Sequence, residues 1–168
     1  MSACDIVILE RVKWDWFVSC TVKMRDASDV YLTKKAFALL RYLCRKDNIY
    51  FPNLPFAIRI ESGRDPYHRH FHMLVGSLVH TAINARFDCM NRWCYLVGTA
   101  DPKFPKGTCR VRLYDGSGGA ACYVASVLNG AEYRGWTEGS LRISTAAIYQ
   151  ARYGACSCPA GIGALHHS

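Results

Sequence analysis

The sequence has no long hydrophobic run, no internal repeat and no low-complexity segment. Its apolar stretches, such as residues 36–40, are far shorter than the ~20 residues that a helix needs to span a bilayer. Asp5 and Glu10 interrupt the N-terminal region before a signal-like apolar core can form. We therefore expect a cytoplasmic protein with no membrane partner, or a nuclear one if it acts in a eukaryotic cell.

Cysteine pairs of the C-x-x-C type are also absent, although the chain has nine cysteines. An odd number without regular spacing does not predict a disulfide framework. Cys20, Cys44 and Cys122 lie in apolar patterns, where a thiol behaves as a small hydrophobic group. These features favour a reducing compartment. Residues 156–158 and 166–167 contain cysteines and histidines that leave zinc binding as an alternative.

A Walker-type phosphate loop is missing, because the glycine-rich residues 116–119 are not followed by G-K-[ST]. Acidic residues are scarce: 13 Asp and Glu stand against 21 Lys and Arg, which gives a net charge of +8. This balance favours a polyanionic partner. The chain also has ten tyrosines, seven phenylalanines and four tryptophans, and aromatic rings near cations suit the stacking faces of unpaired bases.

The 168 residues, of which 51% are hydrophobic, are enough for one globular domain with its own core. We assign residues 1–155 to this domain and residues 156–168 to a flexible tail. The pattern predicts an α+β fold, with a central antiparallel sheet flanked by helices. Strands are expected over residues 14–24, 56–62, 67–76 and 108–114, helices over 31–45, 79–93 and 120–130, and an amphipathic piece over 139–153.

Three histidines alternate with other residues at positions 68, 70 and 72. In an extended strand this spacing places the three imidazoles on one face, while Phe71 and the following apolar residues occupy the other. Neighbouring imidazoles on one face lie about 7 Å apart at their bases, so that two can share a divalent ion. The alternative is a half-buried strand with solvated histidines.

Glu61 lies near the end of the preceding expected strand, close to the turn that leads to the histidines. If the two strands are antiparallel neighbours, Glu61 can lie beside His70 and His72. Two imidazoles and one carboxylate form a donor set for Mn²⁺ or Mg²⁺. The alternative is that Glu61 pairs with Arg59 or Arg64 at the surface.

Several basic residues are candidates for contacts to a phosphate backbone. Arg110 and Arg112 share one face of an expected strand, and Lys34 and Lys35 decorate the first expected helix. A solvated helix face is the alternative for the lysines.

The order of these pieces resembles the HUH endonuclease superfamily of rolling-circle replication initiators. The matching motifs are Phe17-Val18-Ser19-Cys20-Thr21-Val22, Arg69-His70-Phe71-His72-Met73-Leu74-Val75 and the helix 119–128, which contains Tyr123. The resemblance covers residues 14–130. It implies an HUH-type nuclease fold with a ferredoxin-like or RRM-like palm.

The resemblance also implies a reaction. Tyr123 attacks a phosphodiester of single-stranded DNA, which leaves a 5′-phosphotyrosine link and a 3′-hydroxyl that can prime synthesis. His70, His72 and Glu61 hold the divalent ion, His68 is a third ligand or a supporting or DNA-contacting group, and Arg69 contacts DNA. The expected partners are single-stranded DNA or a hairpin origin, together with a host helicase and polymerase.

One departure bears on activity. Many such initiators carry a lysine one turn after the tyrosine, whereas this chain has Ser126 and Val127. Two other functions therefore stay open: a non-catalytic module that binds single-stranded nucleic acid, and a metal-dependent phosphoesterase acting on RNA or small phosphate esters. Tyr114 and Tyr133 are the rival nucleophiles.

Overall fold

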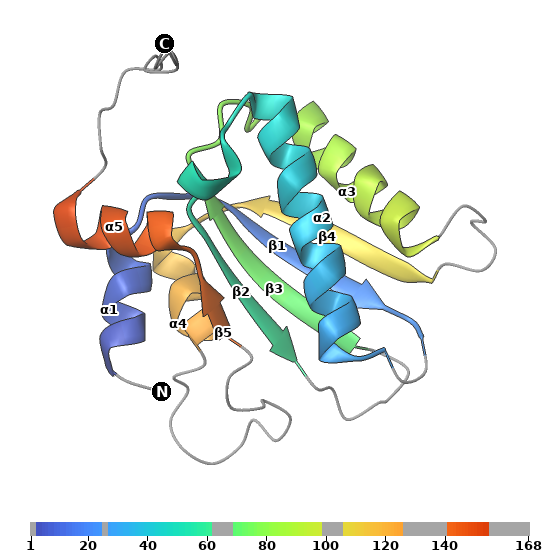
Figure 1. Cartoon of the computed structure of the whole chain (residues 1–168), viewed down its shortest axis with the longest axis horizontal. Helices are drawn as coiled ribbons and strands as arrows, with labels where there is room; N and C mark the ends of the chain where they lie inside the picture. The colour runs from blue at the N-terminus through green and yellow to red at the C-terminus, as the bar shows by residue number, and fades with distance from the viewer. Residues whose placement is uncertain (1–2, 25–26, 62–68, 99–105, 126–140, 155–168) are drawn as a thin grey trace, which may run out of the picture.

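The computed structural model describes residues 3–24, 27–61, 69–98, 106–125 and 141–154 (Figure 1). They form an α+β protein in which helices flank an antiparallel sheet, as the sequence predicted. The strands are β1 (Trp14–Val22), β2 (Phe56–Glu61), β3 (Arg69–Gly76), β4 (Gly107–Leu113) and β5 (Leu141–Ile143). Their order across the sheet is β4-β1-β3-β2-β5. The helices are α1 (Ala3–Arg11), α2 (Asp29–Asp47), α3 (Ile83–Val97), α4 (Ala120–Ala125) and α5 (Thr145–Tyr153), with short 3-10 turns at Phe51–Asn53 and Gly116–Gly118.

Helices α2 and α3 cover one face of the sheet (Figure 1). The side chains of β1 and β3 alternate, so that Val18, Cys20 and Val22 point into the core on this face together with Phe71 and Met73. Every one of these five side chains is fully buried. The apolar stripe of α2 packs against them, which explains why its 19 residues stay helical despite a charged outer side.

A second, smaller apolar cluster lies on the opposite face, where α1, α4 and α5 gather at one end of the sheet (Figure 1). Leu74 and Ala57 from the sheet meet Leu9 of α1, Val124 of α4 and Ala147 of α5 there. The remainder of this face carries the polar side chains of β1, β3 and β4. It is the part of the fold that holds the candidate site.

A β-bulge near the start of β1 places two tryptophans on opposite faces of the sheet. The register with β3 shifts between Trp14 and Trp16, so that Trp14 pairs with Gly76 whereas Trp16 pairs with Val75. As a result Trp14 packs in the smaller cluster and Trp16 in the larger one. In a regular strand, residues two positions apart would share a face. The indole of Trp14 donates a hydrogen bond to the carbonyl of Leu9 at 2.7 Å, which ties α1 to the sheet.

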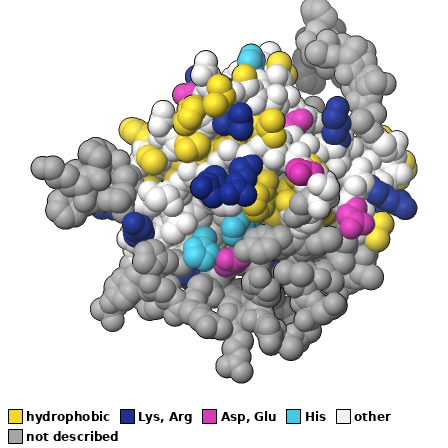
Figure 2. Space-filling model, turned by 180° about the vertical axis from the view of Figure 1, so that it is seen from behind, with side chains coloured by type: hydrophobic (Ala, Val, Ile, Leu, Met, Phe, Trp, Pro, Cys, Tyr) yellow, Lys and Arg dark blue, Asp and Glu magenta, His cyan; other side chains and the backbone are white. Residues whose placement is uncertain are grey.

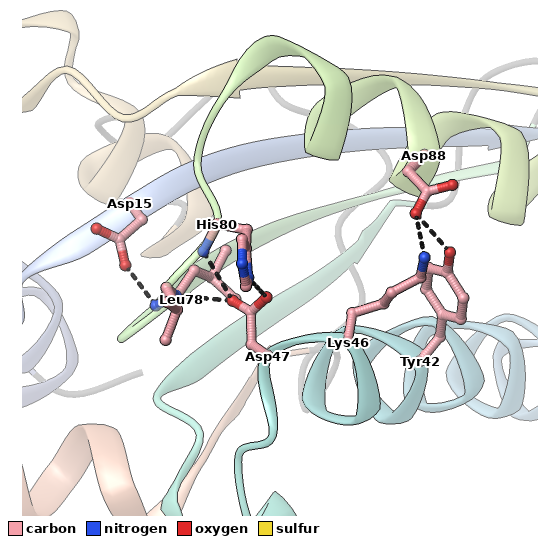
Figure 3. Close-up of polar contacts among 8 residues, drawn as sticks. Asp15, Tyr42, Lys46, Asp47, Leu78, His80 and Asp88 are labelled. Atoms are coloured by element: carbon pink, nitrogen blue, oxygen red, sulfur yellow. Dashed lines mark hydrogen bonds and ion pairs between the residues drawn. The ribbon is translucent and has the colours of Figure 1, made fainter.

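Two carboxylates connect α2 to α3 and to the segment that precedes α3 (Figure 3). Asp47 accepts hydrogen bonds from the backbone N–H groups of Val79 and His80 at 2.7 and 3.2 Å and contacts Nδ1 of His80 at 2.8 Å. Farther along the helix pair, Asp88 accepts from the hydroxyl of Tyr42 and pairs with Lys46. These contacts border a cavity of about 510 Å³ on the α2–α3 side.

The boundaries of several elements differ from the sequence prediction. Helix α1 was not predicted, because its apolar residues give only a weak helical stripe. Helix α3 begins at Ile83 rather than 79, since the preceding residues bind Asp47. The predicted amphipathic piece 139–153 is instead strand β5 followed by α5, with Ser144 capping the helix through a bond from the N–H of Ala147. Helix α4 is described as far as Ala125.

Gly107 lies where β4 approaches β1 closely. A Cβ atom at this position would lie 2.4 Å from the carbonyl oxygen of Thr21, which also accepts from the indole of Trp93. We expect Gly107→Ala to lower the free energy of unfolding by about 2 kcal/mol or more, because backbone cannot yield as a side chain can. Urea unfolding measures the change. Gly116→Ala is the control, since its nearest neighbour would be 3.7 Å away; equal midpoints for both variants would contradict the prediction.

Candidate metal and nucleic-acid site

The histidine strand has the two faces that the sequence predicted. Phe71, Met73 and Val75 are fully buried in the larger core, whereas His70 and His72 lie on the opposite face and are partly exposed. The two rings have their centroids 6.5 Å apart. His68, the third member of the predicted series, lies outside the described residues.

Glu61 lies between the two imidazoles. In the register of β2 and β3 it is opposite His70, and its two carboxylate oxygens face the two rings separately. Oε2 is 3.4 Å from Nε2 of His70, and Oε1 is 3.5 Å from Nε2 of His72. Seen from behind the molecule, this face shows histidine side chains beside an acidic one, next to a cluster of Lys and Arg (Figure 2).

The three residues carry donor types that divalent ions bind, two imidazoles and one carboxylate. Ligand atoms about 2.1 Å from one ion are separated by roughly 3.0 Å at right angles and roughly 3.4 Å at tetrahedral angles. The two nitrogen–oxygen distances, 3.4 and 3.5 Å, are at or just above the tetrahedral value and exceed the right-angle separation of an octahedral ion such as Mg²⁺. Across the described part of the chain, no group of three or more His, Cys, Asp or Glu side chains is arranged so that it could hold a metal ion. An ion would have to enter between the imidazoles and the carboxylate that they now face.

The second nitrogen of His72 is held by a neighbouring strand. Ser19 of β1 is opposite His72 in the register, and its Oγ lies 3.0 Å from Nδ1. The ring also stacks on Phe17, with the centroids 5.5 Å apart and the planes 7° from parallel. Such partners fix the orientation of a metal-binding imidazole. Sequence reasoning did not single out Ser19, although its place between the core residues Val18 and Cys20 put it on the histidine face.

Arg59, which the sequence offered as a surface partner of Glu61, is instead buried. It is opposite His72 on β2, two positions before Glu61, and only 3% of it is exposed. Burial lowers the pKa of its guanidinium from the ordinary value, and the charge of Glu61 acts in the opposite direction. The signal in the sequence was an arginine between Ile58 and Ile60, which strand alternation places on the same face as Glu61.

Arg110 and Arg112 extend the site across the sheet. Arg110 is opposite Ser19, and Ser19 is opposite His72, so the arginine and the histidine lie two strands, or roughly 10 Å, apart at their backbones. Both arginines are exposed. Together they border a depression of about 460 Å³, which is lined by Phe17, Ser19, Thr21, Thr108, Cys109, Arg110 and Arg112.

Three other predicted contacts do not join this surface. Lys34 and Lys35 lie on α2, which packs on the opposite face of the sheet, and the amine of Lys35 donates to the carbonyl of Leu96 in α3. Arg69 donates to the carbonyl of Ala27 at 2.8 Å and pairs with Asp29. These bonds join the start of β3 to the start of α2. We therefore assign Arg69 a role in stabilising the fold rather than in contacting DNA.

Helix α4, which carries Tyr123, packs on the face of the histidines. Ala121 and Val124 are buried in the smaller cluster against Leu74, and Leu74 follows His72 by two residues on the same side of β3. The topology therefore brings the tyrosine helix and the histidine strand to one side of the sheet. The side chain of Tyr123 lies outside the described residues, as does Tyr133.

Comparison of the chain with protein-family models, with curated proteins and with solved structures found no match. Within the described ranges, no helix combines the length and the apolar character needed to cross a bilayer.

Proposed function

We propose that this protein is a metal-dependent endonuclease and strand transferase of the HUH type, which nicks single-stranded DNA through a 5′-phosphotyrosine at Tyr123. One observation carries the proposal. Nε2 of His70 and Nε2 of His72 both face the carboxylate of Glu61, on the side of the sheet where α4 packs.

His70, His72 and Glu61 would hold Mn²⁺ or Mg²⁺. When bound, such an ion withdraws charge from the phosphoryl oxygens and favours the phenolate form of a nearby phenol. Ser19 and Phe17 keep the ring of His72 turned toward the site. The cation of Arg59 interacts electrostatically with the charge of Glu61, which lies two positions farther along β2 on the same face.

In the reaction, the phenol oxygen of Tyr123 forms a bond to phosphorus while the bond from phosphorus to the 3′ oxygen breaks. The phenol proton leaves, and the departing oxygen gains a proton to become the 3′-hydroxyl. Arg110 and Arg112 would bind phosphates of the strand along β4. Reversal of the step rejoins the strand, and a separate helicase and polymerase would supply unwinding and synthesis.

A non-catalytic module that binds single-stranded nucleic acid is the second candidate. It is favoured by Ser126 and Val127, which stand where many initiators carry a lysine one turn after the tyrosine. The same basic depression beside β4 would then bind the strand without turnover.

The two candidates differ in one covalent product. Protein is incubated with a labelled pool of single-stranded oligonucleotides and Mn²⁺, then analysed under denaturing conditions. We expect a labelled adduct that Tyr123→Phe abolishes and that EDTA prevents, because the phenol oxygen is the attacking atom. Tyr95→Phe is the control, since this tyrosine is 73% exposed on α3, on the opposite face of the sheet.

Binding without an adduct would select the non-catalytic module. Cleavage without an adduct would select a phosphoesterase that uses water as nucleophile. An adduct that survives in Tyr123→Phe but disappears in Tyr114→Phe would move the nucleophile to the end of β4.

A further inference from the structure

Two cysteines form a cross-strand pair behind the basic depression. Cys20 of β1 and Cys109 of β4 are directly opposite each other in the register, and their Sγ atoms are 3.4 Å apart. Both thiols are free. Cys20 is fully buried in the larger core, whereas Cys109 is partly exposed on a strand that has only one neighbour in the described sheet.

A third thiol joins the pair from α3. Cys89 hydrogen-bonds to the sulfur of Cys109, which therefore has a thiol neighbour on each side. Hydrogen bonds from Cys20 and Cys89 lower the pKa of Cys109 to about 5, while burial raises the pKa of Cys20. The two neighbouring thiols thus favour the thiolate form at Cys109, and the thiolate is the reactive form of cysteine.

We propose that Cys109 and Cys20 form a peroxide-sensitive dithiol, in which Cys109 is oxidised first and Cys20 then closes a disulfide between β1 and β4. The contact distance and the register carry this inference. Directly opposite residues of antiparallel strands have Cα atoms about 4.5 to 5.5 Å apart, within the range that a disulfide spans. The inference does not depend on the nuclease proposal.

The chemistry needs only a hydroperoxide. The thiolate of Cys109 attacks one peroxide oxygen, the O–O bond breaks, and the other oxygen leaves with a proton as water or an alcohol. The sulfur of Cys20 then attacks the sulfenic sulfur of Cys109; the S–S bond forms, the S–O bond breaks, and the hydroxyl leaves as water with the thiol proton of Cys20. Two electrons have passed from the two thiols to the peroxide.

Tryptic mapping tests the pairing, because each thiol lies on a separate peptide. Cys20 lies on residues 14–23, Cys109 on residues 107–110 and Cys89 on residues 87–92. The folded, reduced full chain is treated with hydrogen peroxide, its remaining thiols are alkylated, and the digest is analysed by mass spectrometry. We expect a cross-linked species that joins residues 14–23 to residues 107–110 and that reduction separates.

Variants separate the two steps. Cys20→Ser should abolish the cross-link and leave Cys109 as a sulfenic acid that dimedone traps. Cys109→Ser should abolish the cross-link and leave Cys20 unmodified, because Cys20 is buried. Cys44→Ser, which removes a buried thiol of α2, should leave the cross-link unchanged.

Three outcomes would overturn the inference: a cross-link between the peptides of Cys89 and Cys109, dimedone trapping of Cys109 in the unaltered chain without any cross-link, or no peroxide reaction at Cys109. Circular dichroism of each variant shows whether the fold is retained. If Cys20→Ser unfolds, the test still stands on two results: which peptides are cross-linked in the unaltered chain, and whether Cys109→Ser loses that cross-link.

Discussion

His72→Ala is expected to slow formation of the Mn²⁺-dependent adduct by about 10³-fold, while the affinity for single-stranded DNA changes little. The imidazole contributes one of three donors to the proposed ion, and several kcal/mol of charge stabilisation depend on that ion. The rate of adduct formation is measured against the concentration of Mn²⁺.

Ser19→Ala gives a graded version of the same test. Losing the partner of Nδ1 should weaken metal binding by about 10- to 100-fold without removing a ligand, as is typical of groups that orient metal-bound imidazoles. Saturating Mn²⁺ should therefore restore most activity in Ser19→Ala and little in His72→Ala. His80→Ala is the control, because this exposed histidine contacts Asp47 on the α2–α3 side. Equal rates for His72→Ala and His80→Ala would refute a metal role for the strand.

Removing Arg110 and Arg112 together is expected to weaken binding of single-stranded DNA and to make it less dependent on salt. Each phosphate contact contributes roughly 0.7 to the slope of log affinity against log salt concentration for a single strand, so the double alanine variant should lose about 1.4. Fluorescence anisotropy over a salt series measures both quantities.

The matched control removes two exposed cations from the other face. Lys34 and Arg45 are both exposed on α2, so the double variant Lys34→Ala/Arg45→Ala changes the net charge by the same amount. We expect its slope to equal that of the unaltered chain. If both double variants lose the same slope, binding depends on overall charge rather than on the depression beside β4.

The sequence predicted the sheet and the histidine strand because both depend on strong local signals. Alternation of imidazoles with Phe71 and Met73 has one structural solution, an extended strand with two unlike faces. The turn expected from the sequence of residues 63–66 made the antiparallel neighbour predictable, and with it the position of Glu61 beside the two rings.

The remainder of the candidate site depends on distant pairing. Ser19 is separated from His72 by 53 positions, so that only the register of β1 against β3 brings them together. Lys34 and Lys35 were placed at the interface because their charge is visible in the sequence, whereas the side of the sheet on which their helix packs is not. Arg69 illustrates the same limit, since its partner Asp29 lies on another element.

The bulge between Trp14 and Trp16 lets one strand supply a tryptophan to each half of the molecule. Deletion of Asp15 would make the two tryptophans successive residues, and successive residues of a regular strand face opposite sides, so each indole would keep its cluster. The deletion would remove the carboxylate that accepts a hydrogen bond from the N–H of Leu78 at 2.8 Å. We therefore expect deletion of Asp15 to destabilise the fold far less than deletion of Ser19, which would turn Cys20 toward the site and Thr21 into the core.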